Sequence, residues 1–317
     1  MVVPVVAWYR LLGVGVTVAI IWSGSSWAAR GGDEPLVVRY PDMSSPLDQR
    51  NTYFEDLLRL ALDKTRDDFG DYRLQAVPLR VPQGRILRLL SAGEQVDVLW
   101  SMTTRNRERH LRPVRIPLTK GMVGYRLLVV RASDHARFAD TKTVEDLARH
   151  VAGQAADWPD TDILRHNELP VTTSGYFSLF TMLQHGRIDY IPRALSEPWV
   201  EVAQRSELDL KVEPTLLLYY PAASYFFVRR QNTALAQRLE QGLERAIADG
   251  SFDELFYQHP SHRPVFKRGE LSDRRVLRLT NPLLPESVPL NRPELWWRPE
   301  TLSATEIDRD DSEVSEP

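Results

Sequence analysis

The sequence contains no cysteine among its 317 residues. This absence excludes disulfides, thiolate metal ligands and a cysteine nucleophile from this chain. Neither sign of charge dominates, since the sequence contains 40 Lys and Arg and 43 Asp and Glu, which gives a formal net charge of −3. Surfaces that bind nucleic acid are usually strongly basic, so we expect no nucleic-acid partner.

Beyond its N-terminus the sequence also lacks an apolar run of the ~20 residues that span a bilayer. The N-terminus contains a shorter apolar run, the uncharged stretch 11–22, which follows the positive charge of Arg10. Ser26 and Ala28 then supply small side chains three and one positions before a cleavage point. We predict a cleavable signal peptide over residues 1–28 and a periplasmic mature protein, which can fold without an oxidant because it has no cysteine.

Segments with β-like and helical patterns alternate along the chain, which predicts an α/β protein with a mainly parallel sheet in its first lobe. The expected strands are 36–40, 72–77, 96–100, 125–131, 188–191 and 225–228. The first expected helix is capped by a Thr52–Glu55 capping box, and a second runs over about 83–91 and ends at Gly93. The longest amphipathic pattern lies in 235–247 and stops at Gly250.

Four segments in order resemble type II periplasmic solute-binding proteins, specifically the amino-acid-binding branch, solute-binding family 3. They are L-S-A-G-E-Q-V-D-V at 90–98 with M-T-T-R-N-R-E at 102–108, V-A-G-Q at 151–154, L-Q-H-G-R-I-D at 183–189, and A-D-G-S-F at 248–252. The resemblance covers about residues 36–258. It implies two hinge-linked lobes that close around a ligand in the cleft between them.

The resemblance and the composition together predict the domain organisation. Lobe 1 is expected to comprise 29–130 plus 222–265, and lobe 2 to comprise 131–221. Residues 266–300 are expected to form an extended, proline-rich C-terminal segment, in which Trp296 and Trp297 are unusual as exposed residues. The acidic residues 301–317 are predicted to be a disordered tail.

In lobe 1 the resemblance points to Arg107, three residues after Thr104, as the arginine that clamps a ligand carboxylate. A planar guanidinium can hold a carboxylate through two parallel hydrogen bonds. The alternative is that Arg107 belongs to a solvated basic stretch. Thr103 and Thr104 could donate hydrogen bonds beside it or cap a helix.

In lobe 2 the corresponding loop contains Asp157, Trp158 and Asp160. The two acids would attract an amine, although Asp160 or Thr161 could instead be a helix N-cap, which is the preferred reading. The family's amine-binding aspartate is replaced by Ala194, beside Arg193, which argues against an ordinary α-amino acid.

Aromatic side chains could complete the cleft. Trp100 and Trp158 could stack on a ligand or fill the core, and Tyr53 could line the cleft. His259 and His262 have a spacing that a metal could use, but no third ligand is evident, so no metal and no cofactor are predicted.

These features predict a monomeric, non-catalytic receptor for a small polar solute that bears a carboxylate or an amine, serving an ABC permease or a membrane sensor. One alternative is a dehydratase of prephenate or arogenate on the same fold, with Asp157, Asp160 or Glu197 as general acid. Another is a degenerate binding protein that contacts a protein partner through its C-terminal segment.

Overall fold

The structure is a computed structural model that describes residues 34–42, 50–267, 271 and 273–299. The predicted signal peptide (1–28) and acidic tail (301–317) lie outside these residues. The chain divides into two units, Met1–Glu34 and Pro35–Pro317, and the helices and strands given below belong to the second. Over the described ranges, no helix combines the length and the apolar character needed to cross a membrane.

Lobe one contains strands from distant parts of the chain. They are β1 (Leu36–Asp42), β2 (Tyr72–Pro78), β3 (Val98–Met102), β4 (Leu111–Val114) and β11 (Ser224–Arg229). β1 pairs with β2 in parallel, whereas β11 lies between β3 and β4 and runs antiparallel to both. The prediction of a mainly parallel sheet is therefore wrong for the centre of this lobe, because β11 enters it from the opposite direction after the chain has passed through lobe two.

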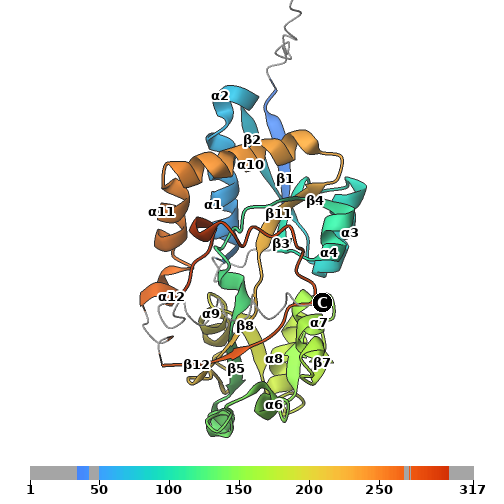
Figure 1. The fold of residues 1–317 in the computed structure, drawn as a ribbon. Helices are drawn as coiled ribbons and strands as arrows, with labels where there is room; N and C mark the ends of the chain where they lie inside the picture. The colour runs from blue at the N-terminus through green and yellow to red at the C-terminus, as the bar shows by residue number, and fades with distance from the viewer. Residues whose placement is uncertain (1–33, 43–49, 268–270, 272, 300–317) are drawn as a thin grey trace, which may run out of the picture. The chain divides into compact units, whose positions relative to one another are not determined.

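Helices cover this lobe at the top, left and right of Figure 1, with α3 and α4 on the right. They are α1 (Arg50–Asp63), α2 (Arg66–Phe69), α3 (Gln83–Ala92), α4 (Arg105–His110), α10 (Thr233–Ala248), α11 (Ser251–Gln258) and α12 (Arg263–Lys267). α1 begins at Arg50, so Thr52 lies inside the helix and the predicted Thr52–Glu55 capping box is wrong. The predicted stop of α3 is confirmed, since Gly93 adopts the left-handed conformation as its C-cap.

α10 lies along α1 (Figure 1), and Gly242 of α10 is at their close contact. A Cβ atom at this position would lie 1.9 Å from the carbonyl oxygen of Ala61, which is rigid helix backbone. Helix propensity alone predicts that Gly242→Ala stabilises the protein by about 1 kcal/mol. We expect the opposite sign, a loss of about 1–3 kcal/mol in the free energy of unfolding, because the helices must move apart. Urea denaturation measures this change, and a gain in stability would contradict the close approach.

Lobe two is organised around β5 (Tyr125–Arg131), whose residues from Tyr125 to Val130 are all buried. Its other strands are β6 (Ala152–Gln154), β7 (Val171–Thr173), β8 (Ile191–Ala194), β9 (Leu210–Val212), β10 (Leu216–Tyr219) and β12 (Arg275–Arg278). β8, β9 and β10 pair antiparallel with β5, β12 pairs in parallel with β10, and β6 pairs in parallel with β7. β8 begins three residues later than predicted.

The helical segments of lobe two surround these strands (Figure 1). They are η1 (Met122–Gly124), η2 (Ala132–Asp134), α5 (His135–Phe138), α6 (Val144–Leu147), α7 (Pro159–His166), α8 (Tyr176–Gln184) and α9 (Pro198–Ala203). Thr143 and Asp146 cap α6 in a reciprocal capping box.

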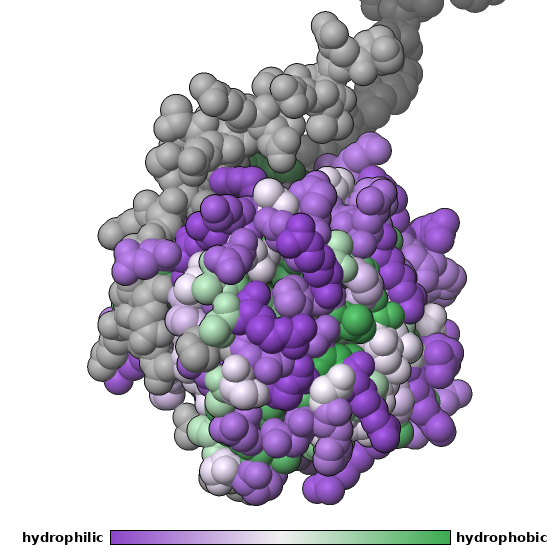
Figure 2. Space-filling view, turned by 90° about the horizontal axis from the view of Figure 1, so that it is seen from below, coloured by the Kyte–Doolittle hydropathy of each residue, from purple (hydrophilic) through white to green (hydrophobic). Residues whose placement is uncertain are grey.

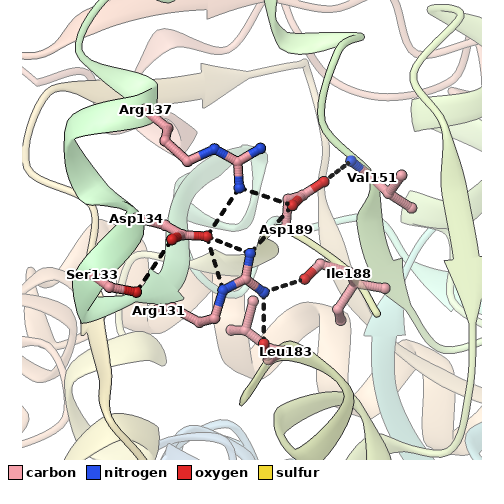
Figure 3. A network of polar contacts seen from close by, with 8 residues as sticks. All are labelled: Arg131, Ser133, Asp134, Arg137, Val151, Leu183, Ile188 and Asp189. Carbon is pink, nitrogen blue, oxygen red and sulfur yellow. Dashed lines mark hydrogen bonds and ion pairs between the residues drawn. The ribbon is translucent and has the colours of Figure 1, made fainter. Parts of the chain in front are cut away.

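The aspartate of the G-R-I-D segment, Asp189, belongs to a polar network that joins lobe-two elements (Figure 3). Its carboxylate accepts a hydrogen bond from the Val151 N–H at 2.9 Å and pairs with Arg131 at 3.3 Å. Arg131, at the end of β5, also donates to the carbonyl oxygens of Leu183 and Ile188, both at 2.7 Å. Asp189 therefore has a structural role in these contacts.

The C-terminal residues connect the two lobes, and we call residues 273–299 the C-terminal strap. The strap starts in lobe two with β12 beside β10 and reaches lobe one, where η3 (Pro293–Leu295) buries Leu295 in the core (Figure 1). Trp296 and Trp297 pack against the same core, and the Trp297 N–H donates to the Lys120 carbonyl at 2.8 Å. The expectation that these two tryptophans are exposed is wrong, because they anchor the strap.

The surface of the unit Pro35–Pro317 is mainly polar on the face shown in Figure 2, with apolar residues in small patches. Phe177 on α8 is the most exposed large apolar side chain of the described residues, at 79%. Single exposed apolar side chains are normal on folded proteins and do not by themselves indicate an interface.

Candidate functional site: a cavity between the lobes

A cavity of about 260 Å³ lies between lobe one and lobe two. Lobe one and the connection that follows β4 contribute Asn51, Phe54, Gln83, Trp100, Ser101, Met102, Thr119, Ser224, Ser261 and His262. Lobe two contributes Met122, Val123, Arg126, Trp158, Pro159, Asp160, Arg193, Ala194, Ser196 and Glu197. Ligand pockets commonly measure ~300–1,000 Å³, so this cavity suits a small solute.

Aromatic rings line the cavity from both lobes. Phe54 of α1 stacks on Trp100 of β3 with ring centroids 5.3 Å apart and an interplanar angle of 11°. In lobe two, the guanidinium of Arg193 lies 4.8 Å from the ring centroid of Trp158. These rings offer flat apolar surface beside charged groups.

Two charged groups of the cavity lining form a buried cluster with a tyrosine. Arg126 of β5 pairs with Asp160 of α7 at 2.7 Å and donates to the Tyr220 hydroxyl at 2.8 Å. The Tyr220 hydroxyl donates in turn to Asp160. Burial lowers the pKa of Arg126, but the nearby Asp160, Tyr220 and Glu197 outweigh it, so the net pKa is raised. The arginine therefore stays charged.

This cluster corrects the expected role of Asp160. The preferred reading placed Asp160 or Thr161 at the N-cap of the helix, but the N-cap position is Trp158 and Pro159 is the first helical residue. Pro fits this first position because the N–H that it lacks has no partner within the helix. Asp160 thus lies in the first turn, where its carboxylate can reach Arg126.

Arg193, one of the predicted ligand contacts, lines the cavity and is also paired. Its guanidinium donates two hydrogen bonds to Glu201, at 2.8 and 2.7 Å, and lies 3.0 Å from Glu197. Glu201 is fully buried and also accepts a hydrogen bond from the Tyr176 hydroxyl at 2.8 Å. These contacts fix the arginine against the wall of lobe two.

Arg107, the predicted carboxylate clamp, is not among the described residues that line the cavity. It is buried and donates to Ser101 Oγ, to the Met102 carbonyl at 2.8 Å, to Gln83 Oε1 at 2.8 Å and to the Asp157 carbonyl at 3.2 Å. Burial lowers its pKa to about 10, against the opposing effects of Asp160 and Asp157. Its guanidinium thus joins lobe one to lobe two, and the alternative of a solvated basic stretch is wrong for this residue.

The other predicted residues beside Arg107 also make structural contacts. Thr104 is the N-cap of α4 and accepts the Arg107 N–H at 3.1 Å, while the Thr103 hydroxyl donates to Glu108 at 2.8 Å. The Asp157 carboxylate accepts the Gly84 N–H at 2.8 Å, a second contact between the lobes. A ligand role for these residues stays a prediction.

Tyr53, which the sequence suggested could line the cleft, is fully buried and is not among the described residues that line the cavity. Its hydroxyl donates to the Leu118 carbonyl at 2.5 Å, and its ring centroid lies 4.1 Å from that of His262. Of the nine predicted residues, the structure brings Trp100, Trp158, Asp160 and Arg193 together around the cavity.

Several cavity residues were missed from the sequence. Arg126 had a usable signal, since it is a charge inside the apolar strand pattern of residues 125–131. His262 was considered only for metal binding, and within the described residues no group of three His, Cys, Asp or Glu could hold a metal. Thr119 carried no signal in the sequence.

Comparisons with known proteins agree with this geometry at the level of fold. No protein-family model and no curated protein sequence matches the chain. It resembles the structure of an ancestral arginine-binding protein bound to glutamine, with a TM-score of 0.55, 18% identity, and coverage of 71% of this chain and 98% of that one.

Two further solved structures are similar. A Salmonella typhimurium periplasmic binding protein described for high arginine specificity gives a TM-score of 0.53 at 15% identity, covering 69% of this chain and 97% of that one. An ancestral amino-acid-binding protein, a precursor of cyclohexadienyl dehydratase, gives a TM-score of 0.50 at 15% identity, covering 70% of this chain and 94% of that one. The resemblance found in the sequence is thus confirmed in the fold: the chain has the two-lobed α/β fold of type II periplasmic binding proteins.

Proposed function

We propose that this protein is a receptor that encloses one small polar solute between its lobes and presents it, in the periplasm, to an ABC permease or a membrane sensor. The observation that carries this proposal is the cavity lined from both lobes, because a ligand there contacts both sides of the hinge and favours closure. The fold supports the same reading, since its structural neighbours include amino-acid-binding proteins.

The charges around the cavity favour a solute without net charge. Among the described residues, the acidic and basic groups that line it are Arg126 and Arg193 against Asp160 and Glu197, two of each sign. Each arginine is already paired with a carboxylate. A net anion or cation would be buried without a free counter-charge, which costs several kcal/mol. We therefore propose that the ligand is zwitterionic or uncharged and polar. This proposal takes the place of the expected ligand whose carboxylate is clamped by Arg107.

The two alternative functions have less support. A dehydratase needs an acid that can give up a proton to its substrate, and Asp160 and Glu197 are each engaged by an arginine. Asp157 is held by Gly84 and is not among the described lining residues. A partner-binding role for Trp296 and Trp297 would require them to leave the core that they pack against.

Trp158→Ala tests the receptor proposal. Native mass spectrometry of the protein taken from its cells would identify a co-purified solute, and calorimetry would give its dissociation constant. We expect the variant to bind about tenfold more weakly, because an aromatic contact contributes roughly 1.4 kcal/mol. Phe177→Ala is the control, since Phe177 is in the same lobe, is 79% exposed and lies outside the cavity. Equal affinity of both variants would contradict a ligand site here, and turnover of added prephenate would favour the enzyme.

A further inference from the structure

The Thr119 side chain places a buried hydroxyl in the wall of the cavity. The residue is buried, with 6% of its surface exposed, and it lines the cavity. Its Oγ1 atom has no hydrogen-bond partner among the described residues. A buried hydroxyl without a partner is costly, so such a group in a cavity wall indicates a partner that binds there.

The turn that bears Thr119 is firmly held. The Met122 N–H donates to the Thr119 carbonyl at 2.8 Å, and the C-terminal strap adds the bond from the Trp297 N–H to the Lys120 carbonyl. Gly121 has a φ of 74°, and a Cβ atom there would lie 2.4 Å from the Trp296 ring. The unpaired hydroxyl therefore sits on a turn that the strap braces, and not on a loosely packed loop.

His262 adds an uncharged acceptor to the same cavity. Its Nδ1 atom lies 3.0 Å from the Phe256 carbonyl oxygen, which can only accept, so Nδ1 carries the hydrogen. Burial lowers the pKa of the ring to about 4, and the ring is neutral at pH 7. A neutral ring with hydrogen on Nδ1 has Nε2 as an acceptor.

Tyr53 holds these two groups in place. Its hydroxyl bonds to the Leu118 carbonyl, one residue before Thr119, and its ring packs on His262. Polar groups fixed in advance are the ones that discriminate between ligands, because they need no rearrangement on binding.

We infer that Thr119 and His262 form an uncharged polar subsite that binds a hydrogen-bond donor, such as a hydroxyl group, on the solute. This inference rests on the proposed receptor function. The paired charges of Arg126, Asp160, Arg193 and Glu197 favour a solute without net charge. Among such solutes, the subsite selects one that bears a hydroxyl group. A site built to hydrogen-bond a hydroxyl strongly rejects the analogue that lacks it.

The test compares probes that differ by one hydroxyl group: L-threonine with L-valine, L-serine with L-alanine, and glycerol with propane-1,2-diol. Calorimetry on the whole protein should show at least tenfold tighter binding of the hydroxyl-bearing member in one or more pairs. Thr119→Val should reduce that preference to less than threefold. Without ligand, this variant should melt at the same temperature as the wild type or higher, because it removes an unpaired buried hydroxyl.

Thr65→Val is the matched control. The Thr65 hydroxyl is also buried, but it donates to the Ala61 carbonyl at 3.1 Å, and neither residue is among the described residues that line the cavity. This variant should melt at a lower temperature and keep the preference for the hydroxyl-bearing probes.

The outcomes separate the subsite from the receptor. Equal binding of both members of each pair by the wild type, an unchanged preference in Thr119→Val, or a lowered melting temperature of that variant without ligand would overturn the subsite alone. Failure of every probe to bind would overturn the receptor for net-neutral solutes and the subsite with it.

Discussion

A chain that ends at Lys267 is expected to lose most or all of its stability. It lacks Leu277, Leu279, Val288 and Leu295, each at most 6% exposed in the full-length protein. Burying one such side chain contributes about 1.5–3 kcal/mol, so together they approach the roughly 5–15 kcal/mol by which a whole domain is stable. The truncation should aggregate on expression or unfold tens of degrees below the full-length protein in a thermal scan.

A chain that ends at Glu300 is the control for this truncation. Residues 301–317 contain few apolar side chains, so their removal should leave the melting temperature unchanged within about 2 °C. If the chain ending at Lys267 melted as the control does, the C-terminal strap would be a surface addition and not part of the core.

The second large effect is expected at the buried pair Arg126–Asp160. Asp160→Asn keeps the shape of the side chain but leaves the Arg126 charge buried without its carboxylate at 2.7 Å. Breaking a buried ion pair from one side costs about 3–5 kcal/mol. We expect a loss of this size in urea denaturation at pH 7.

Asp162→Asn is the matched control, since Asp162 lies on the same helix and is exposed. It should change the free energy of unfolding by less than about 0.5 kcal/mol. Arg126→Met should be as damaging as Asp160→Asn, and the double variant should cost less than the sum of the two, because it removes both charges. Additive losses would show that the two side chains do not stabilise each other.

Much of the fold could be predicted because it follows from local patterns. The strand over residues 125–131 contains a run of four apolar residues, 127–130, and the structure gives β5 the same bounds. The helix stop at Gly93 depends on the backbone of one residue. Such features are encoded within a few neighbouring positions, so a single sequence is enough to find them.

The site could be predicted only in part because it depends on contacts between distant residues. Arg107 was placed by its spacing from Thr104, yet its partner Asp157 is 50 positions away and in the other lobe. Arg126 donates a hydrogen bond to the Tyr220 hydroxyl, and the two residues are 94 positions apart in the sequence. No local pattern tells whether an arginine ends in a ligand cleft or in a contact between lobes.

The docking of Trp296 and Trp297 was missed for a related reason. A proline-rich segment that packs on a core has the same composition as an exposed tail. Only its contacts with the core distinguish a packed segment from an exposed one. Gly121 is part of that core surface, because its missing side chain leaves room for the Trp296 ring.

The C-terminal strap also sets the order in which this protein can fold. Lobe one begins with β1 at Leu36 and is completed by Leu295, so its core joins residues separated by nearly the whole described chain. Such non-local contacts slow folding, because a long loop must be closed before they contribute any stability. Most of lobe two, by contrast, comes from one continuous stretch between β5 and β10. We therefore expect lobe two to become ordered first and lobe one last, so that a chain emerging from a ribosome or a translocation channel remains without a finished lobe one until its last tryptophans have appeared.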